Sequence, residues 1–178
     1  MTENENTAKN PVEDMPTMLA YAHRIEVEAA ERYGMLADQM EIANNTELAA
    51  LFRTMEKVEG KHADHIVEKA GPGGIPQFGP LDYRWEEGEG PETLDLTDIH
   101  YKMTPWHALQ LALAAEKRAY TFFARLAKEA YDKEVQALAR EFAEEEEEHI
   151  EFVTKEMKKY SRPEAGWDED LDPPNHPD

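Results

Sequence analysis

Two Glu-x-x-His sequences, in which a glutamate precedes a histidine by three positions, could do metal chemistry in this chain. Glu59 is paired in this way with His62, and Glu146 is paired with His149. If both stretches are helical, residues three apart lie side by side, so one carboxylate and one imidazole can reach the same metal ion. Oxygen and nitrogen ligands together accept iron, manganese or zinc. A single Glu-x-x-His arises easily by chance in an acidic chain, so the prediction depends on the residues around the two pairs.

Two further glutamates stand where the apolar pattern requires a core residue. Glu26 lies four positions after Ala22 and three before Ala29, and Glu116 has the same place in another apolar stripe. Buried, unpaired carboxylates are destabilising, and four of them in one cavity repel one another. No lysine or arginine falls on these stripes. We therefore expect one or two metal cations to neutralise the four carboxylates.

The four glutamates repeat along the chain as two matching halves. From Glu26 to Glu59 there are 33 positions, and from Glu116 to Glu146 there are 30. An aromatic residue follows the first glutamate of each half by seven positions, and in the first half it is Tyr33. Its hydroxyl could hydrogen-bond to a ligand carboxylate and hold it in orientation, and a core tyrosine bonded elsewhere is the alternative. Two single glutamates and two Glu-x-x-His pairs form the ligand set of di-iron and di-manganese helical bundles.

Four helices are predicted to carry these residues. Apolar residues at intervals of three and four predict them over 16–42, from the turn at 44–46 to about 69, over 105–130 and over 133–160. Few residues separate the helices within each half, so each half is an antiparallel hairpin. Six of the nine glycines fall between residues 71 and 90, which predicts an irregular connection over 71–104. An extended chain of that length can run the full length of the bundle.

The predicted domain is a single all-α unit over residues 16–160, with two antiparallel helical hairpins joined by the long crossover 71–104. A polar tail over 1–15 precedes it. The tail over 161–178 is acidic and contains four prolines, a composition that disfavours a packed structure.

Composition excludes several classes of function. The net charge of −20 disfavours nucleic acid and anionic membrane surfaces as partners. No apolar run is long enough to span a membrane and no leader-like segment begins the chain, so we expect a cytoplasmic protein. The chain has no cysteine, which excludes disulfides, thiolate zinc sites, iron–sulfur clusters and cysteine nucleophiles.

This ordered set of four glutamates and two histidines resembles the rubrerythrin and ferritin-like superfamily, in its rubrerythrin-type branch, over about 16–160. The resemblance implies a ferritin-like four-helix bundle with two iron ions, and a homodimer or higher homo-oligomer. It implies an oxidoreductase that reacts with peroxide or dioxygen, or one that oxidises ferrous iron. Carried over by position, the metal ligands would be Glu26, Glu59, His62, Glu116, Glu146 and His149.

Three departures from the family pattern narrow these expectations. Rubrerythrins proper carry a cysteine-bound rubredoxin iron, so in this cysteine-free chain a separate electron donor would be needed. Many members have an extra glutamate three positions after the ligand of the third helix, where this chain has Ala119. The proline-rich tail provides no fifth helix, which disfavours a self-made storage cage.

Other assignments compete at single positions. Glu145 could pair with His149 at a spacing of four, in place of Glu146. His65 and Glu56 extend the three-residue ladder of the second helix, but that ladder drifts around the helix towards the surface. Lone histidines, which are more often surface or core residues than ligands, are His23, His100 and His107.

Three functions remain open at this point. The first is an oxidoreductase in which two irons reduce peroxide or dioxygen. The second is a ferroxidase or metal-handling protein that uses the same six ligands. The third is a non-catalytic helical scaffold whose inward glutamates are protonated or bridged by water.

Overall fold

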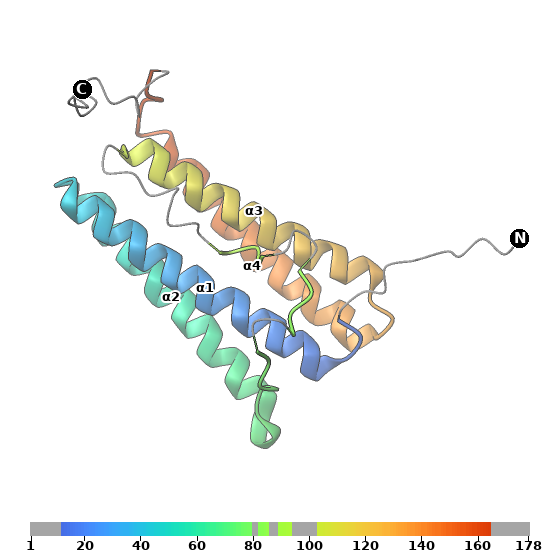
Figure 1. The fold of residues 1–178 in the computed structure, drawn as a ribbon. Coiled ribbons are helices and arrows are strands. Elements are labelled where there is room, and N and C mark those ends of the chain that lie inside the picture. The colour runs from blue at the N-terminus through green and yellow to red at the C-terminus, as the bar shows by residue number, and fades with distance from the viewer. Residues whose placement is uncertain (1–11, 80–81, 86–88, 94–102, 165–178) are drawn as a thin grey trace, which may run out of the picture.

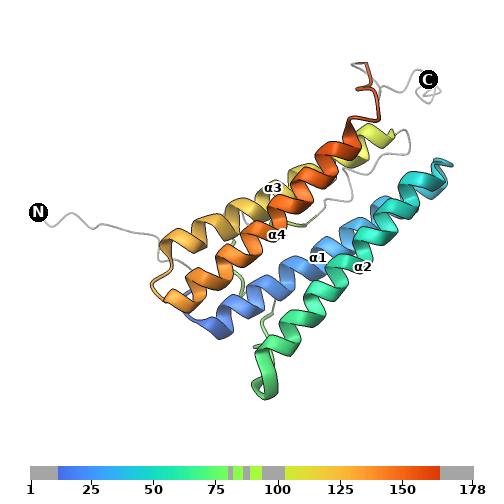
Figure 2. The same cartoon turned by 180° about the vertical axis from the view of Figure 1, so that it is seen from behind.

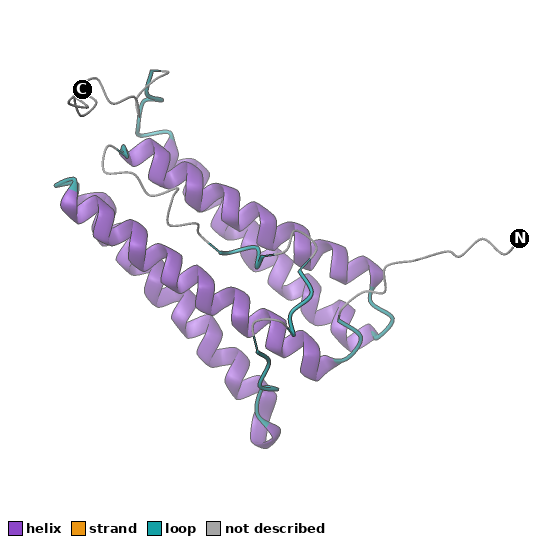
Figure 3. Ribbon diagram, in the orientation of Figure 1, coloured by secondary structure: helices purple, strands orange, loops and turns teal. Residues whose placement is uncertain are grey.

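The computed structural model describes residues 12–79, 82–85, 89–93 and 103–164 (Figure 1). Helices form its framework, and within these ranges no residue is in a β-strand (Figure 3). The elements are α1 Met15–Ile42, α2 Thr46–Ala70, the short 3-10 helix η1 Gly71–Gly73, α3 Pro105–Glu129 and α4 Lys133–Met157. The four predicted helices are confirmed. Their ends agree to within a residue or so except for α4, which ends at Met157 rather than at 160 because the chain turns at Lys158.

Short polar residues fix the two hairpin turns. Asn44 has a φ of 55°, a left-handed conformation that asparagine tolerates better than most residues. The Asn45 side chain accepts a hydrogen bond of 3.0 Å from the backbone N–H of Leu48 and so caps α2. Asp132 caps α4 in the same way, through a bond of 2.7 Å from the Glu134 N–H. Both connections are tight, which makes α1–α2 and α3–α4 antiparallel hairpins.

The two hairpins lie side by side, and the crossover connects opposite ends of the bundle. Figures 1 and 2 show that α2 ends at one end of the molecule and that α3 begins at the opposite end. Described parts of the crossover pack against both hairpins. The backbone N–H of Arg84 bonds to the Tyr21 hydroxyl of α1 at 2.7 Å, and Arg118 of α3 bonds to the Pro91 carbonyl at 2.8 Å. None of the helices in the described ranges has both the length and the apolar character needed to cross a lipid bilayer.

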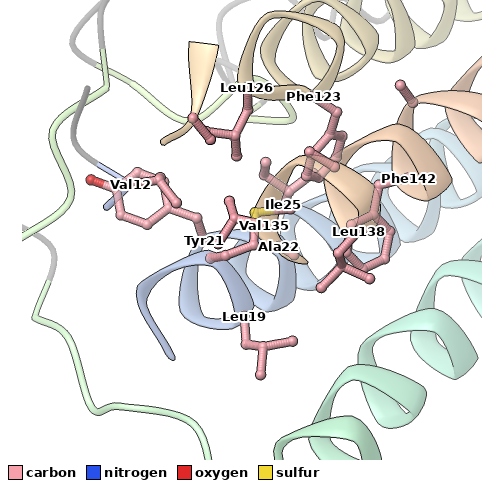
Figure 4. Packing of buried hydrophobic residues seen from close by; sticks show 14 of the residues in the cluster. Val12, Leu19, Tyr21, Ala22, Ile25, Phe123, Leu126, Val135, Leu138 and Phe142 are labelled. Atoms are coloured by element: carbon pink, nitrogen blue, oxygen red, sulfur yellow. The ribbon is translucent and has the colours of Figure 1, made fainter. Parts of the chain in front are cut away.

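The apolar core is divided into two clusters. One fills the end of the bundle around Ile25, Phe123 and Phe142 (Figure 4). The other fills the opposite end around Tyr33 and Phe52. The predicted tails lie for the most part outside the described residues. Between the two clusters is the layer of the bundle that carries the inward glutamates.

Candidate metal centre

The four glutamates predicted to face inward are all buried, one on each helix. Their exposed fractions are 2% for Glu26, 1% for Glu59, 1% for Glu116 and 4% for Glu146. Each interrupts an apolar stripe that packs against the neighbouring helices, so the helical period alone carries it into the interior. The four carboxylates therefore converge in one layer of the bundle.

Glu59 lies between the two histidines. Its Oε2 is 3.3 Å from Nδ1 of His62, and its Oε1 is 3.3 Å from Nδ1 of His149. The two imidazole rings are nearly parallel, with centroids 5.5 Å apart. One carboxylate therefore reaches both imidazoles, and its two oxygens could serve as ligands beside each of them.

The remaining carboxylates divide between the two histidines. Glu26 Oε2 lies 3.6 Å from Nδ1 of His62. Glu116 Oε2 and Glu146 Oε2 lie 3.4 and 3.7 Å from Nδ1 of His149. The ligand atoms form two overlapping groups, and within each group all atoms lie within 4.8 Å of one another. The first group is Glu59, His62 and His149. The second group is Glu116, Glu146 and His149.

Several of these ligand atoms lack a hydrogen bond although they are buried. Among the described residues, no partner with hydrogen-bond geometry exists for Glu59 Oε1, His62 Nδ1 or His149 Nδ1. Buried polar atoms are nearly always bonded, so orphaned atoms that face one another need an explanation. A cation held by oxygen and nitrogen donors satisfies all three, and the residues present fit a pair of such ions.

The electrostatics of the cluster also favour added positive charge. Burial raises the pKa of Glu26 to about 8 and raises that of Glu146 well above its ordinary value. The nearby carboxylates of Glu26 and Glu59 raise the pKa of His62 to about 10. Burial by itself would lower the pKa of His149, but Glu116 and Glu146 raise it to about 12. Without metal, the cluster binds protons where cations would otherwise neutralise the carboxylates.

Tyr33 lies against this layer. Its buried hydroxyl donates a hydrogen bond to Glu116, so of the two alternatives for Tyr33 the structure shows contact with a candidate ligand. Burial raises the pKa of Tyr33 well above its ordinary value, which keeps the hydroxyl protonated and able to donate. The tyrosine of one hairpin thus orients a carboxylate of the other.

The prediction that no basic side chain shares these stripes was wrong. Arg32 is fully buried, and its Nη2 donates to Glu116 Oε1 at 2.9 Å. Helix α1 packs against α2 on one side and against α3 and the crossover on another, so its buried face is wider than one stripe. The available signal was that Arg32 lies three positions after Ala29 and four before Leu36, the interval of the same helical face. Glu92, which pairs with Arg32, lies in the irregular crossover, where no periodicity indicates a buried side.

The competing assignments lie further from the layer. Glu146 is buried next to His149, whereas Glu145 is half-buried at the edge. His65 is exposed and lies near Glu68, and Glu56 bonds to Arg53 at 3.1 Å. Of the lone histidines, His107 bonds to Thr104, His23 is partly buried on α1, and His100 is outside the described residues.

Known proteins resemble this chain both in sequence and in fold. The family model for rubrerythrin matches residues 17–157. A crystal structure of an uncharacterized conserved protein from Magnetospirillum magnetotacticum MS-1 is 37% identical, with a TM-score of 0.70. The match covers 85% of this chain and 98% of that one. No curated protein matches the chain.

Proposed function

The chain belongs to the rubrerythrin family, and from that premise we propose that it binds two iron ions and uses them to reduce peroxide or dioxygen. The observation that carries the proposal is the buried layer itself. Four carboxylates and two imidazoles meet there, and three of their ligand atoms have no hydrogen-bond partner among the described residues. A scaffold with no metal would have to neutralise the carboxylates with protons, and it would leave these three atoms without a partner.

The residues have distinct roles in this proposal. Glu59 faces both imidazoles and would bridge the ions. Glu26 and His62 would complete one position, and Glu116, Glu146 and His149 would complete the other. Bound iron would supply electrons and Lewis acidity. The protein supplies the fixed geometry and a protonated Tyr33 that holds Glu116.

The histidines form the more exposed edge of the layer. The side chains of His62 and His149 are 28% and 12% exposed, whereas those of the four glutamates are 6% exposed or less. In this proposal a small oxidant such as peroxide or dioxygen would approach from the side of the imidazoles. The carboxylates remain shielded from water, which strengthens their hold on a cation.

A second function, oxidation of ferrous iron as the substrate, is favoured by the absence of cysteine from the chain. This chain cannot hold a thiolate-bound iron that would return electrons to the centre. Reduction of peroxide in repeated turnovers would require a separate electron donor. Oxidation of ferrous iron requires none, because the substrate provides the electrons.

The test is anaerobic loading of the purified protein with ferrous iron, followed by mixing with peroxide or with air. We expect two ions per chain and a near-ultraviolet absorption band of ferric iron after mixing. We expect peroxide to react faster than dioxygen, in keeping with the Glu-x-x-His pair in both halves. The reverse order would favour the ferroxidase. If iron binds stoichiometrically but neither oxidant changes the spectrum, the protein holds metal without catalysing a reaction. If no metal binds, the result supports the non-catalytic scaffold.

A further inference from the structure

A short piece of the crossover, residues 89–93, is fastened to both hairpins. We refer to it as the strap. Arg118 of α3 donates to the Pro91 carbonyl at 2.8 Å, and Thr93 donates from its hydroxyl to Glu28 of α1 at 3.0 Å. Gly90 lies so close to the Glu28 carboxylate that a Cβ at this position would collide with it. The strap is therefore held in a fixed position across α1 and α3.

The strap places one acidic side chain, Glu92, inside the protein. Glu92 is 1% exposed, and its Oε2 accepts a bond of 2.8 Å from Nε of Arg32 and a second bond from Nη2. Arg32 is fully buried and extends over the Tyr33 ring, with its guanidinium carbon 4.1 Å from the ring centroid. The guanidinium is thus fixed on one side by Glu92 and on its face by Tyr33.

The same guanidinium reaches a candidate metal ligand. Arg32 Nη2 donates to Glu116 Oε1 at 2.9 Å, and the Tyr33 hydroxyl donates to the same oxygen. The other oxygen, Glu116 Oε2, faces His149 Nδ1 at 3.4 Å. The two oxygens of Glu116 therefore have separate roles, one bound by protein donors and one directed into the layer.

We propose that Glu92 is a positioning residue for the metal centre, which acts through Arg32 to hold Glu116 with Oε2 directed at the metal. This inference rests on the proposed function, because it requires that the layer binds metal. Glu92 belongs to neither group of close ligand atoms found among the described residues. It fixes the arginine that, with Tyr33, leaves one oxygen of Glu116 free to bind a metal ion.

Glu92 also keeps the arginine from opposing the metal. An unpaired buried guanidinium would place a full positive charge beside a site for cations, and in a low dielectric that repulsion is strong. A guanidinium can also bind a carboxylate through two parallel hydrogen bonds. An unpaired Arg32 would therefore compete with the metal for Glu116. Arg32 Nη1 has no hydrogen-bond partner among the described residues, which leaves a donor free for that competition. Glu92 accepts from both Nε and Nη2 of Arg32, and these two bonds hold the guanidinium in place and limit that competition.

The test compares Glu92→Gln with Glu28→Gln in anaerobic calorimetric titrations with ferrous iron. Glu28 is a matched control, since it is also buried and also holds the strap, but it bonds to Thr93 and Arg24 rather than to Arg32. We expect Glu92→Gln to weaken one of the two binding steps about 10- to 100-fold, the usual effect of losing a partner of a metal ligand. Glu28→Gln should leave both steps at wild-type affinity.

A double variant, Arg32→Met with Glu92→Met, covers the case in which Glu92→Gln does not fold. It removes both members of the Arg32–Glu92 pair together, and apolar replacement of a buried ion pair is often tolerated. We expect it to weaken the same single step, because Glu116 again loses its fixed orientation. Wild-type affinity in a folded Glu92 variant would overturn the inference, as would equal weakening by Glu28→Gln. Failure of the wild-type protein to bind iron would instead refute the proposed function on which the inference rests.

Discussion

Glu26 and Glu116 occupy equivalent places in the two hairpins, yet their surroundings differ. Glu116 accepts hydrogen bonds from Arg32 and Tyr33, whereas Glu26 has its contact with His62, 3.6 Å away. Burial raises the pKa of Glu26 to about 8. Burial would also raise that of Glu116, but Arg32 and His149 lower its pKa below the ordinary value. Two glutamates with the same place in the repeat therefore hold different charge.

The difference begins in the sequence next to each glutamate. Arg32 and Tyr33 follow Glu26 along α1, and both reach across to the other hairpin. The residues 90 positions later are Phe122 and Phe123. Phe122 stacks on Tyr21 with centroids 6.0 Å apart, and Phe123 packs into the apolar cluster. The first half of the repeat therefore supplies hydrogen-bond donors to the metal layer, whereas the equivalent residues of the second half pack into the apolar core. The two metal positions are therefore not equivalent.

The largest expected effect separates the two histidines. His149 belongs to both groups of ligand atoms, whereas His62 belongs to one. We expect His62→Ala to abolish binding of one ion, and His149→Ala to abolish binding of one ion and also to reduce the occupancy of the other, because His149 Nδ1 faces Glu59 Oε1 as well. Each variant should lose more metal affinity than the roughly 10- to 100-fold that is typical when a residue next to a ligand is changed, because here the ligand itself is removed. Elemental analysis after iron loading measures this, with circular dichroism as the control for folding. Identical stoichiometry in the two variants would contradict the inequivalence.

A pH titration tests the difference in charge. In the metal-free protein, burial raises the pKa of Glu26 from 4.5 to about 8, and Glu26 and Glu59 raise that of His62 from 6.5 to about 10. Between pH 6.5 and 8 the folded protein therefore holds more protons than the unfolded chain. Its stability should fall as pH rises, by about 1.4 kcal/mol per pH unit for each extra proton.

Metal binding should show the opposite dependence over the same range. An incoming ion must displace these protons, so its affinity should rise with pH. Denaturant unfolding of the metal-free protein and calorimetry in buffers of different protonation enthalpy measure the two trends. Glu26→Gln removes one of the titrating groups and should flatten the stability curve. A metal-free stability that does not change from pH 6.5 to 8 would show that Glu26 and His62 hold no extra protons.

The fold was predictable because its signals are local and repeated. Each helix has an apolar stripe of many residues, and polar caps such as Asn45 and Asp132 mark where two of them begin. Glu26 and Glu116 were found by the same stripes, as the charged residues that interrupt them. Their burial is a direct consequence of the helical period.

The pairing of Arg32 with Glu92 was not predictable in this way. Helical spacing places Arg32 on the face of Ala29 and Leu36, but it does not indicate that its partner comes from the crossover. Glu92 lies in a segment without periodic structure, and its partner is 60 positions away in sequence. When a buried charged residue pairs with a residue outside the helices, tertiary packing decides the pairing. Helical spacing therefore indicated the candidate ligands but not the residues that hold them in position.

A smaller effect is expected from Tyr33→Phe, which makes the first half resemble the second. The variant removes one hydrogen bond to the buried Glu116 carboxylate and leaves the bond from Arg32. Bonds to charged groups contribute about 1.5–3 kcal/mol, so the free energy of unfolding should fall by that amount. Tyr83→Phe is the control, since its hydroxyl makes a long bond of 3.5 Å to the Ala20 carbonyl, at the strongly apolar end of the bundle. Equal losses in urea unfolding would show that Glu116 gains nothing special from Tyr33.

The smallest effect is expected where the hairpins meet through an exposed ion pair. Lys69 of α2 lies 3.1 Å from Glu141 of α4, and the two side chains are 30% and 53% exposed. Water and salt screen such a pair, so Lys69→Met should change the free energy of unfolding by less than about 1 kcal/mol. It should leave both iron-binding steps unchanged, because neither residue touches a candidate ligand in the described part of the chain. The buried Arg32–Glu92 pair also joins distant segments, but it acts on Glu116 without screening by water. If Lys69→Met weakened iron binding as strongly as Glu92→Gln, docking of the hairpins rather than orientation of one carboxylate would control the metal layer.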